Sequence, residues 1–210
     1  MEINVDKTSY MIISRSKADF KTRLTVNDLK IDQVQEAKIV GVWLTSDMKW
    51  EKNTKELTRK AYSRMSMLTK LKYAGVCRED LLDVYVLFIR SIAEYCTVVW
   101  HSSITGYLIR RIEMVQKTCL RIILGDNYVS YEAALEMFNL STLFDRRESR
   151  CLSFVQKCLK HNVHKRMFPL NFNNEQNKHR SREKYTVNFA RTTTYQISAI
   201  PYHQRLLNSL

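Results

Sequence analysis

Basic residues recur at helical spacing after Trp50, and their side chains are suited to contact with a polyanion. They alternate with apolar residues such as Leu57, Ala61 and Leu68, which fall on the opposite face of the same predicted helix. Such a stripe can follow phosphates without reading bases, although the same pattern is also typical of a solvated helix face. The residues that we predict to bind nucleic acid are Lys52, Lys55, Arg59 and Lys70.

Two further patterns bear on metal chemistry. Cys158, His161 and His164 form C-x-x-H-x-x-H on one helical stripe, a spacing that can ligate zinc, but no fourth ligand is evident. Two-metal phosphoryl transfer needs carboxylates from adjacent strands, and the sequence contains no Asp-Asp pair. Four aspartates near the N-terminus fall where turns are expected: Asp6, Asp28, Asp32 and Asp47. We therefore predict no metal site, no catalytic residue and no cofactor in this chain.

The elements that must position the basic stripe are mostly helices, because 210 residues contain only 4 Gly and 2 Pro. The first runs from Trp50 to a stop at Gly75. A central helix over residues 77–100 is apolar nearly all round, and the next begins at Thr105 and ends at Gly125. A short helix covers residues 130–138, and Thr142 with Asp145 has the spacing of a capping box that starts another.

A small β piece precedes the helices. Extended segments are predicted at residues 8–14, 23–27, 29–34 and 38–44, separated by polar turns. The last segment breaks at Gly41, either at a tight backbone turn or at a strand bulge. The predicted fold class is therefore mainly α with a small N-terminal β piece, divided into residues 1–48, a helical domain over 49–164 and a basic segment over 165–210.

The formal net charge of +13 predicts attraction to polyanions, with nucleic acid the first candidate and an anionic membrane the second. The longest apolar run, Val84 to Ile89, is far too short to span a bilayer, and the first residues lack an apolar signal region. We expect an intracellular protein, nuclear or cytoplasmic and not secreted. Five cysteines without a C-x-x-C pair are expected to be small buried hydrophobic residues in a reducing compartment.

Five stretches, taken in order, resemble the C-terminal part of reverse transcriptases from jockey-like non-LTR retrotransposons. These are EINVDKTSYMIISR, KIVGVWLTSDMKW, LLDVYVLFIRSIAEYCTVVWHSSIT, RIEMVQKTCLRIILG and IPYHQRLLN. The resemblance covers essentially the whole chain. It implies the end of a palm with antiparallel strands, then a thumb-like helical bundle and a basic tail.

The same resemblance implies roles for particular residues. Val40, Gly41, Val42 and Trp43 match the primer-grip hairpin, whose tightly turning backbone holds the 3′ end of the primer. Lys7 matches a lysine that lies near the incoming nucleotide, and the basic stripe after Trp50 matches the thumb surface that closes on the template-primer duplex. Mg²⁺ is expected for the intact family enzyme.

We therefore predict a truncated RNA-directed DNA polymerase whose remaining activity is binding of an RNA–DNA or DNA duplex, largely independent of base sequence. The isolated chain is expected to be inactive as a polymerase, and no membrane partner is expected. The alternative is a helical protein-interaction module or a non-functional retroelement remnant.

Overall fold

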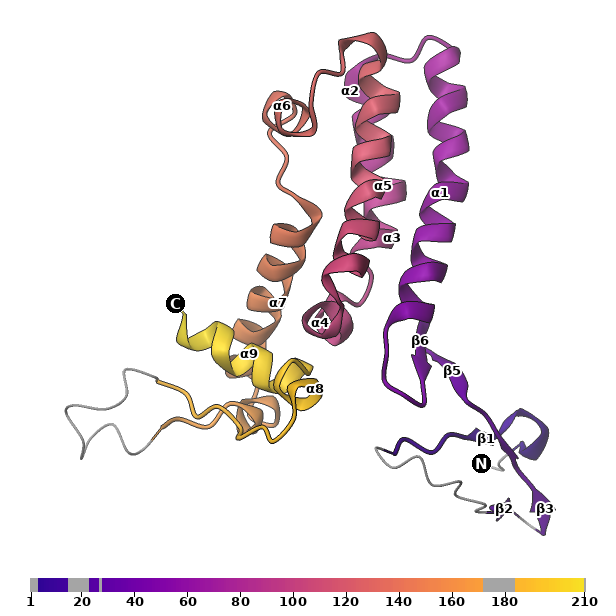
Figure 1. The fold of residues 1–210 in the computed structure, drawn as a ribbon, viewed down its shortest axis with the longest axis vertical. Helices are drawn as coiled ribbons and strands as arrows, with labels where there is room; N and C mark the ends of the chain where they lie inside the picture. Colours follow the sequence, from indigo (N-terminus) through magenta and orange to yellow (C-terminus); the bar gives the residue numbers. More distant parts are fainter. Residues whose placement is uncertain (1–3, 15–22, 27, 172–183, 210) are drawn as a thin grey trace. The chain divides into compact units, whose positions relative to one another are not determined.

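The computed structural model describes residues 4–14, 23–26, 28–171 and 184–209 (Figure 1). It is mainly helical with a few short strands, which confirms the predicted fold class. The chain divides into two compact units, Met1–Glu56 and Leu57–Leu210. The boundary falls inside the first long helix, α1 (Glu51–Tyr73).

Unit 1 contains three strand pairs among its described residues. After a short 3-10 turn (Val5–Lys7), the strands are β1 (Ser9–Tyr10), β2 (Thr25–Val26), β3 (Leu29–Lys30), β4 (Asp32–Gln33), β5 (Glu36–Ile39) and β6 (Val42–Thr45). β2–β3 and β5–β6 are antiparallel, as expected, whereas β1 and β4 pair in parallel. Asp32, expected in a turn, lies in β4.

The β5–β6 hairpin resolves the two interpretations of Gly41. Ile39 pairs with Val42, so Val40 and Gly41 form a two-residue turn, with φ of 45° and 82°. Two successive positive φ angles match the twist of a tight hairpin, and glycine adopts one of them without steric cost. Gly41 therefore lies in a hairpin turn and not in a bulge.

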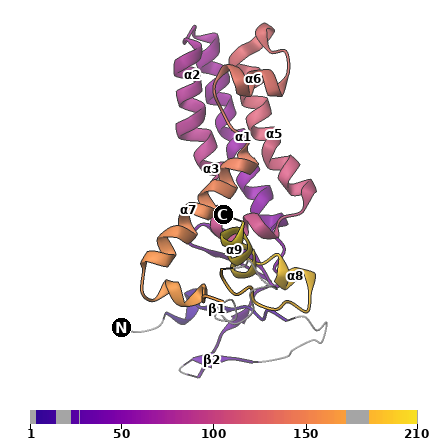
Figure 2. The ribbon, with the colours of Figure 1, turned by 90° about the vertical axis from the view of Figure 1, so that its left-hand side faces the viewer.

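Unit 2 is built from helices that follow α1. Their bounds are α2 (Arg78–Val84), a π-helical turn η2 (Tyr85–Arg90), α3 (Ser91–Ala93), α4 (Thr97–Trp100), η3 (His101–Ser103), α5 (Gly106–Leu124), η4 (Gly125–Asn127), α6 (Tyr131–Met137), α7 (Leu143–Lys160), η5 (His164–Met167), α8 (Thr193–Gln196) and α9 (Ala199–Asn208). The α2–α3 segment and α5 run alongside the part of α1 that belongs to this unit, and α9 packs near the C-terminal half of α7 (Figures 1 and 2).

The helix ends confirm the capping signals in the sequence. Gly75, with φ of 82°, ends α1 in a Schellman motif, because the N–H groups of Gly75 and Val76 donate to Lys72 and Leu71. The Thr105 hydroxyl accepts from the N–H of Leu108 at the start of α5. At the start of α7, the Thr142 hydroxyl accepts from the N–H of Asp145 (3.1 Å) and donates to its carboxylate (2.7 Å).

The predicted continuous helix over residues 77–100 is wrong in two respects. Cys96 adopts a left-handed conformation, with φ of 50°, so the helix breaks between α3 and α4. The break is held by a bond from the Trp100 indole N–H to the carbonyl of Tyr95 (2.9 Å). Its surface is also not buried all round, because Leu87 is 65% exposed and Phe88 48% exposed on neighbouring positions of η2.

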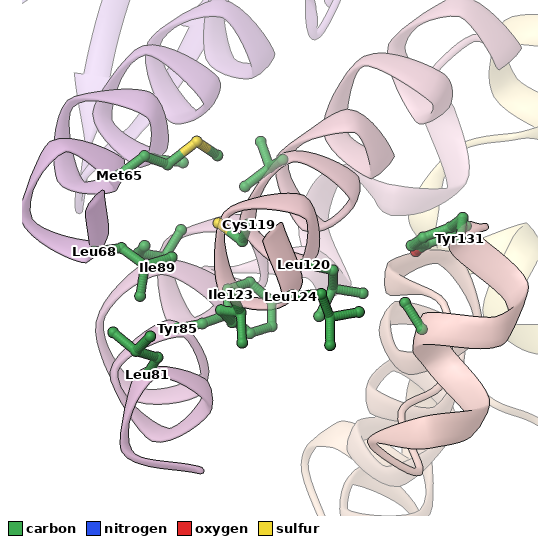
Figure 3. Packing of buried hydrophobic residues seen from close by; sticks show 13 residues of the cluster. Met65, Leu68, Leu81, Tyr85, Ile89, Cys119, Leu120, Ile123, Leu124 and Tyr131 are labelled. Atoms are coloured by element: carbon green, nitrogen blue, oxygen red, sulfur yellow. The ribbon is translucent and has the colours of Figure 1, made fainter. Parts of the chain in front are cut away.

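The main hydrophobic core lies between α1, the α2–η2 segment, α5 and α6 (Figure 3). Leu68 from α1, Ile89 from η2 and Leu120 from α5 are fully buried there. Tyr85 and Gln116 add a buried hydrogen bond between the hydroxyl and the side-chain carbonyl. This core fixes the orientation of the part of α1 that belongs to unit 2 and, with it, the direction in which Arg59 and Lys70 point.

The described part of the C-terminal segment packs onto α7 through α9. Val155, Cys158, Phe168 and Leu207 form a second, smaller cluster of buried apolar residues. No helix was predicted over residues 199–208, so α9 is an addition to the expected basic tail. Residues 172–183 of that tail, which include Lys178, lie outside the described residues.

The cysteines are only partly as expected. Cys119, Cys151 and Cys158 are buried, and burial raises the thiol pKa of both Cys119 and Cys151 to about 12. Cys96 is half-buried, and Cys77 is exposed at the start of α2, where the prediction of a buried residue is wrong.

Candidate nucleic-acid surfaces

The four predicted basic residues lie on α1, and helical spacing places them on one face. Leu57, Ala61 and Leu68 are buried on the other side of the helix. Lys55, Arg59 and Lys70 are exposed, and Lys52 is half-buried. We call the set the α1 stripe: Lys52, Lys55, Arg59 and Lys70. The first two residues belong to unit 1 and the last two to unit 2.

Lys52, a member of the α1 stripe, is held by two contacts within unit 1. Its ammonium forms an ion pair with Glu36 on β5 at 3.2 Å and lies 4.9 Å from the centre of the Trp43 ring. Both interactions reduce the positive potential that Lys52 offers to a ligand, because the carboxylate and the ring face each provide negative charge density. Lys52 therefore contributes less to anion attraction than the sequence pattern suggests.

The hairpin that matches a primer grip packs against the first turns of α1, within unit 1. Asn53 is buried and its side-chain carbonyl accepts from the N–H of Trp43 at 3.2 Å. The Val42 side chain is buried, whereas Val40 is 79% exposed at the tip. The exposed Val40–Gly41 turn is thus the part of the hairpin that a ligand can approach through its backbone.

Lys7 lies exposed at the end of the first 3-10 turn, where its N–H donates to the Asn4 side chain at 3.2 Å. Asp47 is a turn residue, as predicted. Its carboxylate accepts from the Thr45 hydroxyl (2.6 Å) and the Lys49 N–H (3.1 Å), and these contacts, the Thr45 bond first, lower its pKa. A carboxylate with these hydrogen bonds stabilises the turn that precedes α1.

A second basic surface, which the sequence analysis missed, runs along α7. Its members are spaced by three, four or seven residues and so share one face of the helix. We call it the α7 basic face: Arg146, Arg150, Lys157 and Lys160. Arg150, Lys157 and Lys160 are exposed, and Arg146 is half-buried. Within the described residues, neither Lys157 nor Lys160 has a carboxylate partner.

Glu94 holds the first turn of the α7 basic face. Its side chain is only 2% exposed and receives hydrogen bonds from Arg146, while Arg150 pairs with it at 2.7 Å and Arg90 at 3.8 Å. Three guanidinium groups around one carboxylate leave a local excess of positive charge. Burial, and then the neighbouring charge of Arg146, lower the pKa of Arg90, which indicates repulsion within the cluster.

Near this cluster, Arg147 points inward and is completely buried. Its Nε–H donates to Nδ1 of His101 at 3.4 Å, and its guanidinium carbon lies 5.9 Å from the Trp100 ring centre. Both terminal nitrogens of Arg147 and Nε2 of His203 have no hydrogen-bond partner among the described residues. Burial lowers the pKa of both His101 and His203 to about 4.

No group of three or more His, Cys, Asp or Glu side chains in the described part of the chain is arranged to hold a metal ion. His161 and His164 lie with their ring centres 4.5 Å apart, but Cys158 is buried against α9 and the second cluster. In the same part of the chain, no helix has the length and apolar character needed to cross a membrane.

Comparisons with protein-family models, with curated proteins and with solved structures found no match for this chain.

Proposed function

We propose that this protein binds nucleic-acid duplexes through the phosphate backbone, as the thumb-containing part of a reverse transcriptase of the non-LTR retrotransposon type. The observation that carries the proposal is the α1 stripe, whose basic residues lie opposite the buried face of a 23-residue helix. Four charges over about 27 Å of helix suit a regularly spaced polyanion. The Val40–Gly41 turn is the proposed backbone contact to the 3′ end of a primer.

Polymerisation by this chain alone is not part of the proposal, because the sequence contains no Asp-Asp pair to hold two metal ions. The bound duplex is expected to be read by its shape and charge and not by its bases. Phosphate contacts set register and affinity but carry little base-sequence information.

The test is a titration of an RNA–DNA and a DNA duplex with the full chain at several salt concentrations, followed by fluorescence anisotropy. Replacement of all four α1-stripe residues by Gln should lower the slope of log K against log salt by up to about 3–4 units. Fully exposed positions should change stability by no more than about 0.5 kcal/mol each.

A matched control carries four Gln replacements at exposed basic positions off the stripe: Lys30, Lys38, Lys60 and Arg78. It removes the same formal charge and should retain most of the salt slope. An equal loss in both variants would show that only net charge attracts the duplex, and absence of duplex binding by the parent chain would reject the proposal.

A second candidate function, a protein-interaction module, is favoured by the exposed Leu87 and Phe88 on η2. Large exposed apolar side chains on neighbouring positions are typical of contact surfaces. This function predicts a protein complex that survives high salt and is lost in a Leu87→Ser/Phe88→Ser variant, with duplex binding unaffected by that change.

A further inference from the structure

The α7 basic face carries more charge than its surroundings compensate. From Ser149 to Asn174 the sequence contains five Lys or Arg residues and no Asp or Glu. These are Arg150, Lys157, Lys160, Lys165 and Arg166. Six acidic residues of unit 2 lie around the start of α2, η4 and α6, namely Glu79, Asp80, Asp83, Asp126, Glu132 and Glu136. Glu94 is buried beside the arginines, and Asp145 and Glu148 lie in the first turns of α7. The charge that acidic neighbours in the sequence do not offset therefore lies in the second half of α7 and just after it.

The arginines of this face are held before any ligand arrives. Glu94, buried and bonded to both Arg146 and Arg150, restricts two long side chains that are otherwise mobile. Restriction in the unbound protein reduces the conformational entropy lost on binding. Glu94 cancels only one of the three positive charges beside it, so an incoming anion would also relieve repulsion within the cluster.

The spacing of the α7 basic face fits a repeated anion. Arg146 and Lys160 are separated by 14 positions, or about 21 Å along the helix. A nucleic-acid strand presents about six phosphates over that length. A single small anion could satisfy the arginines near Glu94, but it could not reach Lys157 and Lys160 as well.

We infer that the α7 basic face is a second binding surface for the phosphodiester backbone of a nucleic-acid duplex, separate from the α1 stripe. The inference rests on the proposed function for the class of ligand, and it adds a surface on a different helix. Arg150, which pairs with Glu94 through one terminal nitrogen, contacts phosphate with its remaining nitrogens, whereas Lys157 and Lys160 act as point charges farther along the helix.

The test compares two triple variants in the full chain with a DNA duplex of roughly 20 base pairs, about two helical turns. One variant carries Arg150→Gln, Lys157→Gln and Lys160→Gln on the α7 basic face. The other carries Lys60→Gln, Arg78→Gln and Arg110→Gln, which removes the same formal charge from other exposed positions of unit 2. The first should lower the salt slope by about 2–3 units and the second by less than about 1. Thermal melting of each variant shows that folding is retained.

A second readout does not depend on substitution. An amine-reactive reagent applied to the parent chain should modify Lys157 and Lys160 more slowly when duplex is bound, while the rate at Lys60 stays the same. Protection of Lys70 alone, with an unchanged slope in the α7 variant, would overturn the inference and leave the proposed function standing.

Two other outcomes would overturn the inference. If the parent binds no duplex, both the proposed function and this inference fail. If vesicles containing anionic lipid bind the parent more tightly than duplex does, and the α7 variant loses only the vesicles, the occupant is a membrane surface and the inference is wrong.

Discussion

The two ends of the helical unit bury different kinds of side chain. Between α1, η2 and α5 the core consists mainly of aliphatic side chains such as Leu68, Ile89 and Leu120. Between α4, α7 and α9 the buried side chains include Arg147, His101, His203 and Gln204. The packing of the first region depends on how well apolar side chains fill the available space. The packing of the second depends on hydrogen bonds and on the protonation state of its buried side chains.

The polar contacts of the second region determine the position of the C-terminal segment. Gln204 on α9 donates to the carbonyl of Met167 (2.9 Å) and accepts from the N–H of Asn188 (2.8 Å), and Tyr202 donates to Glu148 (3.2 Å). These contacts require one arrangement of α9, because a shifted helix would leave buried polar groups without partners. We therefore expect the apolar end to set stability and the polar end to set how the last helix docks.

The largest expected effect tests the apolar end. Leu120→Ala should lower the free energy of unfolding by about 2–5 kcal/mol, because Leu120 is fully buried and the truncation leaves a cavity. Chemical denaturation measures the change. Leu87→Ala is the control, since Leu87 is 65% exposed and should cost no more than about 0.5 kcal/mol. Similar costs at both positions would contradict the described core.

The second prediction concerns pH at the polar end. Unfolded histidines bind protons near pH 6.5, whereas His101 and His203 do so only near pH 4 in the folded chain. The unfolded state thus binds more protons between these values, and stability falls as pH falls through this window. At pH 5 the loss should be up to about 2 kcal/mol for each histidine.

Denaturant titrations at pH 7 and pH 5 measure this loss. His161→Gln/His164→Gln is the control, because both residues are exposed and the pH dependence should stay as in the parent. The prediction would be contradicted by a His101→Asn/His203→Asn variant that retains the whole loss of stability between the two pH values.

A smaller effect of opposite sign is expected at Arg147. Both terminal nitrogens of its buried guanidinium lack a partner among the described residues, and burial lowers its pKa. Arg147→Met leaves an unbranched apolar side chain that fills part of the space and removes the buried charge, so stability should stay equal or rise by about 1–2 kcal/mol. A clear loss of stability on denaturation would show that the charge is compensated in the folded protein.

The helices and helix ends that depend on local sequence pattern could be predicted from the sequence. Helical periodicity and the caps at Thr105 and Thr142 located α5 and α7, and Gly75 marked the end of α1. These signals act within one or two turns of helix and need no partner from elsewhere in the chain.

The features that were missed depend on distant residues. The break after α3 follows a left-handed Cys96 and a Trp100 indole bond, neither of which has a periodic signature. The helical spacing of the α7 basic face is present in the sequence, but the contact that holds its first turn comes from Glu94, 52 positions before Arg146. The orientation of α9 likewise depends on polar contacts with residues outside the helix.

The contact between Lys72 and the end of α5 has a consequence for related sequences. The Lys72 ammonium donates to the carbonyl of Ile122, and a Cβ placed on Gly125 would lie only 2.5 Å from that ammonium. Gly125 also has a positive φ of 57°. A side chain at position 125 would therefore expel the ammonium as well as strain the backbone. In homologous chains, residues 72 and 125 should covary, with a larger residue at 125 accompanied by the loss of a long basic side chain at 72.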